Sequence, residues 1–360
     1  MKILKQTIPF CLSLVLLLCV GCNTNTTSDG IITSNNETST TEDISVSQDI
    51  FTMDTYMTIT AYGDNADQAV DKAIALIEEL DAQLSTGSDS SEITLINQNG
   101  NRTLSAAPAE ILSRALEISE MTDGAFNPAM YPIMEAWGFP TQNYRVPTDD
   151  ELESLLPLTN LDNMTFNETS GEVTLSTGMA LDLGGIVKGY TSSQIMDIFT
   201  ENGITSGIVS LGGNVQTLGT KTDGNLWRVA LQNPDESADY LGVLEIDNKT
   251  VITSGSYERY FEEDGITYHH IIDPKIGYPA DSGLQSVTIV SDDGTLADGL
   301  STALFVMGLD EGITFWRSHS DEFDVIFYTT DNKLYVSQGL KNIFSSDSYE
   351  WEIIEEASET

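Results

Sequence analysis

The positions of the cysteines are the strongest constraint on how this chain can fold. All three cysteines, Cys11, Cys19 and Cys22, lie at the start of a chain of 360 residues. The rest of the chain therefore has no disulfide, no thiol nucleophile and no cysteine ligand for a metal. It must be stabilised by an apolar core, and 40% hydrophobic residues are enough for one large domain or two small ones. Any catalysis there must use oxygen and nitrogen groups.

The N-terminus is typical of an exported lipoprotein. Lys2 and Lys5 precede an apolar run at 8–20, which is too short to span a bilayer and has the form of a signal peptide. The run ends in Leu-Cys-Val-Gly-Cys, which resembles a bacterial lipobox. We predict that residues 1–21 are a signal peptide and that Cys22 is lipidated, with ordinary secretory cleavage as the alternative. The protein would then be anchored by lipid at the extracytoplasmic face of the cell membrane.

Composition divides the remainder of the chain. Between residues 23 and 47, 16 of the 25 residues are Ser, Thr or Asn, so residues 22–47 are predicted to be a disordered tether. Residues 48–345 are predicted to be a single catalytic domain, and 346–360 an acidic tail without fixed structure. The net charge of -41 argues against nucleic-acid binding, which depends on Lys and Arg. A phosphate ester substrate would need help from a divalent cation.

The spacing of apolar residues predicts a mixture of helices and strands. Helices are expected at 67–84, 108–121, 186–200 and 296–308. Strands are expected at 51–62, 171–183, 207–213, 226–231, 242–246, 251–254, 269–272, 286–290 and 324–328. Because helices and strands do not alternate regularly, the pattern predicts an α+β fold.

Two glycine pairs follow predicted strands. Gly184 and Gly185, in the segment DLGGIVKGY at 182–190, would let the backbone approach a ligand and point N–H groups toward a phosphate. Lys188 is a candidate phosphate contact. A plain turn and a surface lysine are the commoner outcomes of such a pattern. The second pair, in SLGG at 210–213, is by itself no more than a bend at the end of a strand.

Two other groups of polar residues are candidates for chemistry. Asp298 and Thr302 are four residues apart, so a helix would point both oxygens to one side, as a site for a hard cation requires. An N-cap aspartate is the alternative interpretation. His269 and His270 are adjacent and would face opposite sides of a strand, so one is expected to be packed and the other exposed or catalytic. His319 is expected to lie on the surface.

Taken in order, these segments resemble the ApbE family of FAD:protein FMN transferases. The resemblance runs from about residue 51 to 344. It rests on Met53-Asp54-Thr55, Leu84-Ser85-Thr86, Asp123-Gly124-Ala125-Phe126-Asn127-Pro128, Trp137-Gly138-Phe139, the two glycine segments, Thr253-Ser254-Gly255, His270-Ile271-Ile272-Asp273-Pro274 and Ala297-Asp298-Gly299-Leu300-Ser301-Thr302-Ala303. It implies layers of mainly antiparallel sheet packed with helices, T-fold-like, with FAD in a cleft.

The resemblance also implies a reaction and a set of site residues. A Thr or Ser hydroxyl of an extracytoplasmic acceptor protein, such as an FMN-binding domain or a redox-complex subunit, would attack the FMN phosphorus of FAD and release AMP. Mg²⁺, or alternatively Ca²⁺ or Mn²⁺, would be held by Asp298, Thr302 and the carbonyl of Gly185, and His270 would accept the proton. The FAD site would comprise Met53, Gly87, Ala125, Phe126, Asn127, Asp182, Lys188 and Ile272.

Two departures from the family pattern keep alternatives open. Gly87 stands where many members have an aromatic residue, and Asn127 replaces the usual Asp. Hydrolysis of FAD to FMN and AMP therefore competes with transfer, as does a lipoprotein that binds FAD without chemistry. Family acceptors carry Asp-x-x-(Ser/Thr)-(Gly/Ser)-Ala-(Ser/Thr). The near match at 298–304 ends in Leu, so the chain is not expected to modify itself.

Overall fold

The computed structural model describes residues 44–234 and 240–357. The predicted signal peptide, Cys22 and nearly all of the predicted tether lie outside these ranges. The helices are α1 (Ala66–Leu84), α2 (Glu92–Asn99), α3 (Ala106–Met121), α4 (Tyr131–Trp137), α5 (Asp149–Leu155), α6 (Val187–Glu201) and α7 (Gly294–Arg317). The strands are β1 (Ser45–Thr52), β2 (Thr55–Tyr62), β3 (Asn101–Thr103), β4 (Met164–Asn167), β5 (Glu172–Leu175), β6 (Ser206–Leu211), β7 (Asn214–Leu218), β8 (Trp227–Gln232), β9 (Tyr240–Ile246), β10 (Thr250–Gly255), β11 (Tyr260–Glu263), β12 (Ile266–His269), β13 (Leu284–Ser291), β14 (Phe323–Thr329), β15 (Leu334–Ser337), β16 (Phe344–Ser345) and β17 (Trp351–Ile354).

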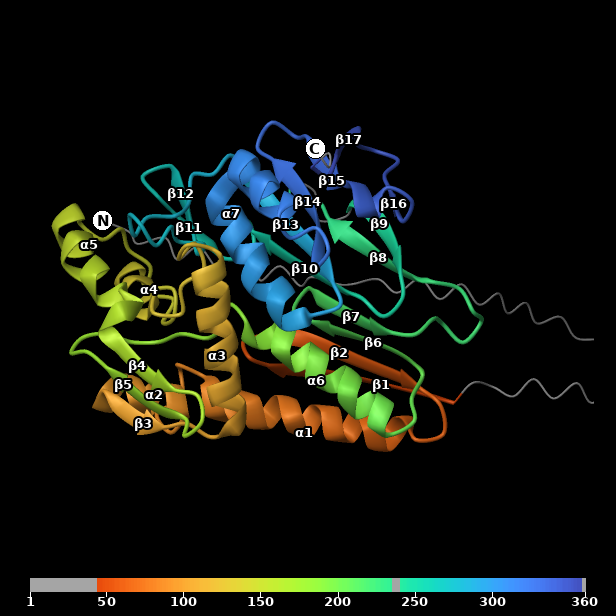
Figure 1. Cartoon of the computed structure of the whole chain (residues 1–360), viewed down its shortest axis with the longest axis horizontal. Coiled ribbons are helices and arrows are strands. Elements are labelled where there is room, and N and C mark those ends of the chain that lie inside the picture. The colour runs from red at the N-terminus through yellow and green to blue at the C-terminus, as the bar shows by residue number, and fades with distance from the viewer. Residues whose placement is uncertain (1–43, 235–239, 358–360) are drawn as a thin grey trace, which may run out of the picture.

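A nine-stranded sheet organises the fold. Its strand order is β1-β2-β6-β7-β10-β13-β14-β15-β17, and neighbouring strands are antiparallel except for β15 and β17. Helices α1, α6 and α7 pack against one face of it, and α3 packs on α7 (Figure 1). The small sheet β16-β9-β8 packs against the other face through a shared apolar cluster. The predicted α+β class is confirmed.

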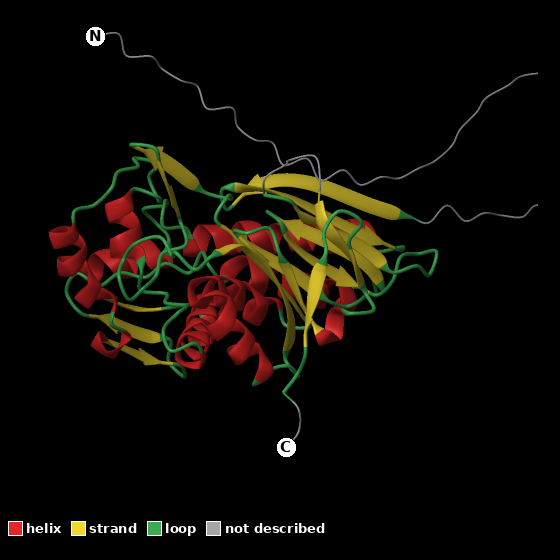
Figure 2. Ribbon diagram, turned by 90° about the horizontal axis from the view of Figure 1, so that it is seen from above, coloured by secondary structure: helices red, strands yellow, loops and turns green. Residues whose placement is uncertain are grey.

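A second group of elements stands beside the large sheet. It comprises α2 to α5, the sheet β3-β5-β4 and the hairpin β11-β12 (Figure 2). Trp137 at the end of α4 is fully buried, and its Nε1–H donates to the carbonyl of Gly277 at 2.8 Å. This bond joins α4 to the loop after β12, which begins at His270.

Helices α6 and α7 cross at two glycines. A Cβ on Gly189 would overlap the carbonyl oxygen of Gly294 and would come within 2.7 Å of the Cβ of Asp298. A Cβ on Gly294 would lie 2.6 Å from the carbonyl oxygen of Gly189. Since neither position has room for a side chain, only glycine lets the two helix backbones touch here.

Polar contacts attach this crossing to the sheet. The hydroxyl of Ser192 on α6 donates to Oε1 of Gln216 on β7 at 2.6 Å, and the N–H of Gly294 donates to the hydroxyl of Ser193 at 3.1 Å. Gln216 is itself buried, so the bond satisfies a carbonyl oxygen that has little access to water. The first turns of α6 and α7 are therefore held at fixed positions over β7.

The predicted strand at 51–62 is instead a hairpin. Thr52 pairs with Thr55, and the two residues between them, Met53 and Asp54, have φ of 48° and 57°. Two positive φ values match a type I′ turn, which usually contains Asn or Gly. The turn is not evident from the sequence, because Asp54 is a common turn residue but Met53 is not, and no glycine interrupts the alternating pattern.

Other boundaries also differ from the predictions. Of the strand expected at 171–183, only β5 is extended in the ladder, and residues 181–183 lie in a loop. The strand expected at 269–272 is wrong, because β12 ends at His269 and only an isolated bridge joins Ile272 to Pro279. The helix expected at 296–308 continues to Arg317, with an interruption at Gly308, where φ is 78°.

Both ends of the predicted domain extend further than expected. β1 begins at Ser45, inside the predicted tether, because the edge of the sheet offers it backbone partners in β2. β17 lies within the predicted acidic tail and pairs in parallel with β15. Ile354 on β17 is buried, so this strand has an apolar contact with the core that its acidic composition did not indicate. In the described part of the chain, no helix combines the length and apolar character needed to cross a membrane.

Replacing Gly189 by alanine is expected to lower the free energy of unfolding by about 3 kcal/mol, because the new methyl group forces α6 and α7 apart. Urea unfolding followed by circular dichroism measures this change. Gly87→Ala is the matched control: Gly87 is exposed and its new Cβ would lie 3.6 Å from the nearest atom, so we expect a change within about 0.5 kcal/mol. Equal urea midpoints of unfolding for the two variants would contradict the conclusion that the close contact between α6 and α7 requires glycine.

Candidate active site

The buried carboxylate of Asp298 is the centre of the candidate site. It lies in the second turn of α7 and is 5% exposed. Its Oδ2 accepts from the backbone N–H of Gly189 at 2.8 Å, and its Oδ1 accepts from Nδ2 of Asn214 at 3.1 Å. The N-cap of α7 is Asp293, whose Oδ1 accepts from the N–H of Leu296 at 3.0 Å, so Asp298 is not a capping residue.

Burial raises the pKa of Asp298, while the positive charge of Lys188 and the hydrogen bonds from Gly189 and Asn214 lower it. None of the side-chain nitrogens that donate to Asp298 is cationic: Asn214 supplies a neutral amide. A buried carboxylate of this kind favours the approach of a cation, because its charged form is desolvated and incompletely compensated.

A row of hydroxyl groups continues from Asp298 along the same side of α7. The hydroxyl of Thr302 lies 3.3 Å from that of Ser254, at the end of β10, and Ser254 is 2.8 Å from the hydroxyl of Ser301. Ser301 donates in turn to the backbone carbonyl of Asp298 at 2.8 Å. The structure therefore brings the predicted metal ligands Asp298 and Thr302 to one helix face, as their spacing indicates.

The first glycine pair forms the turn that leads into α6. The N–H of Gly184 donates to Oδ1 of Asp182 at 2.8 Å, and both glycines are exposed. A Cβ on Gly185 would lie 3.2 Å from Cε2 of Phe126, so the glycine lets this backbone pass close to the Phe126 ring. The predicted FAD residues Asp182 and Phe126 and the predicted metal ligand Gly185 therefore lie next to one another.

Five charged side chains share one region around this turn. Burial raises the pKa of Asp182, and the charges of Arg259 and Lys188 act against this rise. Glu258 is exposed, but desolvation by the protein around it raises its pKa to about 7, with Lys188 and Arg259 again lowering the pKa and Asp298 raising it. Because these fields fall off with distance, the mutual effects show that two cations and three carboxyl groups lie close to one another. Such clusters of perturbed groups are typical of functional sites.

The sequence analysis assigned no role to three members of this site. Glu258 and Arg259 follow Thr253-Ser254-Gly255, and the only available signal was a pair of opposite charges after a glycine. Asn214 follows the second glycine pair, Gly212 and Gly213, which forms the tight turn between β6 and β7. That turn delivers the Asn214 amide to Asp298, so the second glycine pair has a structural purpose that its sequence alone did not indicate.

Among the residues that the structure describes, only one ring nitrogen of His270 has a hydrogen-bond partner. Its backbone N–H and its Nδ1–H both donate to the carbonyl of Arg259, at 3.0 and 3.2 Å. Since a carbonyl can only accept, the ring is the Nδ1–H tautomer, and Nε2 carries the lone pair. Burial, together with the charge of Arg259, lowers the pKa of His270 to about 3. The imidazole is therefore neutral at physiological pH and able to accept a proton.

The other two described histidines have structural contacts. His269 donates from Nε2 to the carbonyl of Ala280 at 3.2 Å and accepts from the N–H of Ile271 at 3.3 Å, so both ring nitrogens are used. Both histidines are half-buried, and β12 ends at His269, so the predicted contrast between a packed and an exposed histidine on one strand is not observed. They differ in that only His269 uses both ring nitrogens in hydrogen bonds among the described residues. His319 stacks on Phe315 with ring centroids 4.3 Å apart, away from the charged cluster.

The remaining predicted FAD residues differ in what they offer. Both ends of the Asn127 amide are engaged: Nδ2 donates to the carbonyl of Thr159 at 3.0 Å, and Oδ1 accepts from the N–H of Ala129 at 2.8 Å. Its side chain therefore shapes the loop. Ala125 and Ile272 are buried, Met53 is the first residue of the β1–β2 turn, and Gly87 lies exposed before α2. Among the described residues, none of the charged cluster is in contact with Gly87, so the structure does not place Gly87 in the site.

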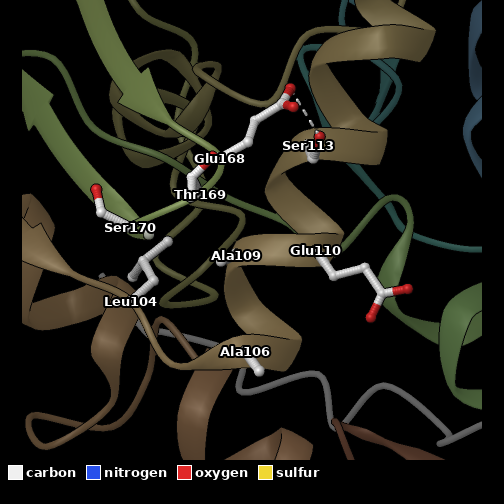
Figure 3. A pocket seen from close by; sticks show the side chains of 9 residues that line it. Leu104, Ala106, Ala109, Glu110, Ser113, Glu168, Thr169 and Ser170 are labelled. Carbon is white, nitrogen blue, oxygen red and sulfur yellow. Dashed lines mark hydrogen bonds between the residues drawn. The ribbon is translucent and has the colours of Figure 1, made fainter.

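A separate groove of about 530 Å³ lies between α3 and the turn that joins β4 to β5 (Figure 3). Two of its lining side chains are the carboxylates of Glu110 and Glu168, which accept from Tyr190 and Ser113 respectively. Its other lining residues are Leu104, Ala106, Ala109, Ser113, Thr169, Ser170 and Gly171. With two acidic groups and no basic one, this groove does not suit an anionic dinucleotide, and it contains none of the predicted site residues.

The donor atoms around Asp298 fit a hard divalent cation. They are its own carboxylate and the hydroxyl of Thr302, one turn further along α7, and both supply oxygen. The family resemblance adds the carbonyl of Gly185, in the exposed turn before α6. Among the described residues, no group of three or more His, Cys, Asp or Glu could hold a metal ion. A cation here would therefore take one carboxylate with neutral oxygens and substrate phosphate, the pattern that suits Mg²⁺.

Glu258 is expected to make stability depend on pH. Between its unperturbed pKa of 4.5 and its folded value of about 7, the folded state binds more protons at this group than the unfolded state does. The free energy of unfolding should therefore fall as pH rises through that interval. Glu258→Gln should lose this component, which urea unfolding of both proteins in EDTA at several pH values would measure. Parallel pH profiles for the two proteins would show that the carboxyl titrates normally.

Comparisons with known proteins identify the family of the chain. The model of the ApbE family matches residues 53–327. An FAD:protein FMN transferase of Klebsiella pneumoniae is 34% identical over 289 residues, which cover 79% of this chain and 89% of that protein. One of Treponema pallidum is 32% identical over 297 residues, covering 76% and 80%.

Solved structures give the same result. The ApbE protein of Thermotoga maritima superposes with a TM-score of 0.79 at 30% identity, covering 84% of this chain and all of that one. The flavin transferase ApbE of Vibrio cholerae has a TM-score of 0.75 at 27% identity, covering 84% and 99%. The resemblance inferred from the ordered motifs is confirmed, and the chain belongs to the ApbE family.

Proposed function

We propose that this protein uses a divalent cation to transfer the FMN moiety of FAD to a Thr or Ser hydroxyl of an extracytoplasmic acceptor protein, releasing AMP. Membership of the ApbE family makes the chain a flavin transferase in the general sense. The observation that carries the finer proposal is the buried carboxylate of Asp298, with Lys188 beside it and hydroxyl groups continuing along its helix.

The cationic groups are suited to the pyrophosphate of FAD. Lys188 and Arg259 act on the same carboxyl groups, so they lie over one region in a chain that is otherwise strongly acidic. The N-terminus of α6, which closely follows Gly184 and Gly185, adds the positive end of a helix dipole. A bound Mg²⁺ would offset further negative charge on the phosphates.

His270 is suited to receive the proton of the acceptor hydroxyl. The hydroxyl oxygen forms a bond to the FMN phosphorus while the bond from that phosphorus to the bridging oxygen breaks, and AMP leaves with that oxygen. The hydroxyl proton passes to Nε2, the nitrogen that the Arg259 carbonyl leaves free. The low pKa of His270 keeps this nitrogen unprotonated before the reaction.

Water could replace the acceptor hydroxyl and give FMN and AMP. The observation that favours this alternative is the exposed Gly87, where the absence of a side chain leaves the flavin end of the predicted site less enclosed. The extracytoplasmic location and lipid anchor rest on the sequence of residues 1–22.

Incubating the protein with FAD, Mg²⁺ and a folded FMN-binding domain that carries the family acceptor motif should give a fluorescent acceptor band, because the flavin is covalently attached. Mass spectrometry should show the acceptor gaining one FMN phosphoryl group. Asp298→Asn should lower the rate by at least about 100-fold, because the buried charge that attracts the cation is lost. EDTA should have a similar effect on the wild-type protein.

The matched control is Asp293→Asn, in the same helix, since asparagine caps a helix as well as aspartate does. We expect its transfer rate to stay within about twofold of wild type. AMP and free FMN without a labelled acceptor would identify the hydrolase instead. Equal activity of Asp298→Asn and wild type would contradict the proposed role of the carboxylate.

A further inference from the structure

Two exposed aromatic side chains lie together at the tip of the β1–β2 hairpin. Phe51 and Tyr56 are directly paired across the strands, with ring centroids 5.0 Å apart in an edge-on arrangement. They are 56% and 57% exposed. We call these two residues the hairpin aromatic pair. Aromatic side chains contribute strongly to protein interfaces, because they bury a large area with few rotatable bonds.

The hairpin aromatic pair is close to the candidate active site. The carbonyl of Tyr56 accepts from the N–H of Gly212 at 3.1 Å. Gly212 begins the turn that ends at Asn214, and Asn214 donates to Asp298. A protein bound to the hairpin tip would therefore lie beside the charged cluster.

The pair lies on the face of the hairpin that the helices leave free. Met57, Ile59 and Ala61 alternate with Tyr56 along β2, and they are buried in the cluster that α1 and α6 form with the sheet. Tyr56 therefore points away from those helices. At the other end of β2, this outer face is covered by the small sheet, because Trp227 on β8 packs against Tyr62.

The tip is also held rigidly. Met53 and Asp54 adopt left-handed backbone conformations, and a Cβ on Gly212 would overlap the side chain of Thr55, so the two hairpin turns fit closely together. A surface that is already ordered loses little entropy when a partner binds.

We propose that the hairpin aromatic pair is the docking surface for the flavin-accepting protein, which presents an apolar patch surrounded by Lys or Arg. This inference rests on the proposed function, because a transferase must hold a macromolecular acceptor beside its reacting groups. The basic rim follows from charge: Asp49 and Asp54 flank the pair with exposed carboxylates, and the whole chain has a net charge of -41.

The test compares a folded acceptor with a small one. The probes are an FMN-binding domain that carries the family acceptor motif and a short peptide of that motif alone. In the double variant Phe51→Thr/Tyr56→Thr, we expect the KM for the domain to rise by about tenfold or more. The rate with the peptide and the Kd for FAD should not change, since neither requires the docking surface.

Ile44→Thr is the matched control. Ile44 is 57% exposed directly before β1, and Gly63, after β2, donates to its carbonyl, so it marks the end of the hairpin away from the tip. Its KM for the domain should equal that of wild type. Asp54→Asn, which keeps a residue that tolerates the left-handed conformation, should raise this KM about two- to threefold at low salt and less at high salt. The Asp54→Asn measurement therefore tests the docking surface even if the double aromatic variant does not fold.

Each contrary outcome is distinguishable. An unchanged KM for the domain in both variants, or an equal rise for domain and peptide, would overturn the docking proposal while leaving the transferase intact. A higher Kd for FAD would show that the pair belongs to the nucleotide site. Dimerisation of wild type that the double variant abolishes, measured by sedimentation, would assign the pair to a second copy of this chain. Transfer by wild type to neither probe would instead refute the proposed function.

Discussion

The close contact between α6 and α7 is the constraint on which the candidate site depends. Gly189 and Gly294 let the helix backbones touch, and the same contact brings the first-turn N–H of Gly189 to the carboxylate of Asp298. A methyl group at either glycine would separate the groups that orient the carboxylate. The bonds from Ser192 and Ser193 to β7 and α7 hold this crossing over the strand that carries Asn214. The same helix contact therefore both packs α6 against α7 and orients the carboxylate of Asp298.

Charge explains why such a site suits an acidic protein that acts on FAD. A chain with 56 acidic and 15 basic residues repels phosphate over most of its surface. Around the Gly184-Gly185 turn, however, Lys188 and Arg259 lie beside carboxyl groups whose pKa values desolvation has raised. The balance of positive and negative charge around this turn therefore differs from that of the whole chain. A divalent cation at Asp298 would continue the same compensation along the pyrophosphate.

The two hairpins connect this interior site to the surface. The β6–β7 turn delivers Asn214 inward to Asp298, whereas the β1–β2 turn displays Phe51 and Tyr56 outward. The turns meet where the N–H of Gly212 donates to the carbonyl of Tyr56, so the proposed docking surface lies close to the candidate active site. An enzyme that modifies another protein needs this proximity, since the acceptor hydroxyl must reach the phosphorus while the rest of the acceptor stays outside.

The sequence by itself determined the features that depend on local periodicity and on ordered motifs. The amphipathic spacing placed α1 and α3 within about two residues, the mixture of elements indicated α+β, and the motif series identified the family. The same series predicts Asp298, Thr302 and Gly185 as metal ligands. Only the tertiary structure decided how these parts meet. The β1–β2 turn lacks glycine, β17 needs β15 as a partner, and the roles of Asn214, Glu258 and Arg259 arise from contacts between distant segments. Local spacing cannot encode such contacts, because the burial and the fields that perturb these groups exist only after the helices and sheet have packed.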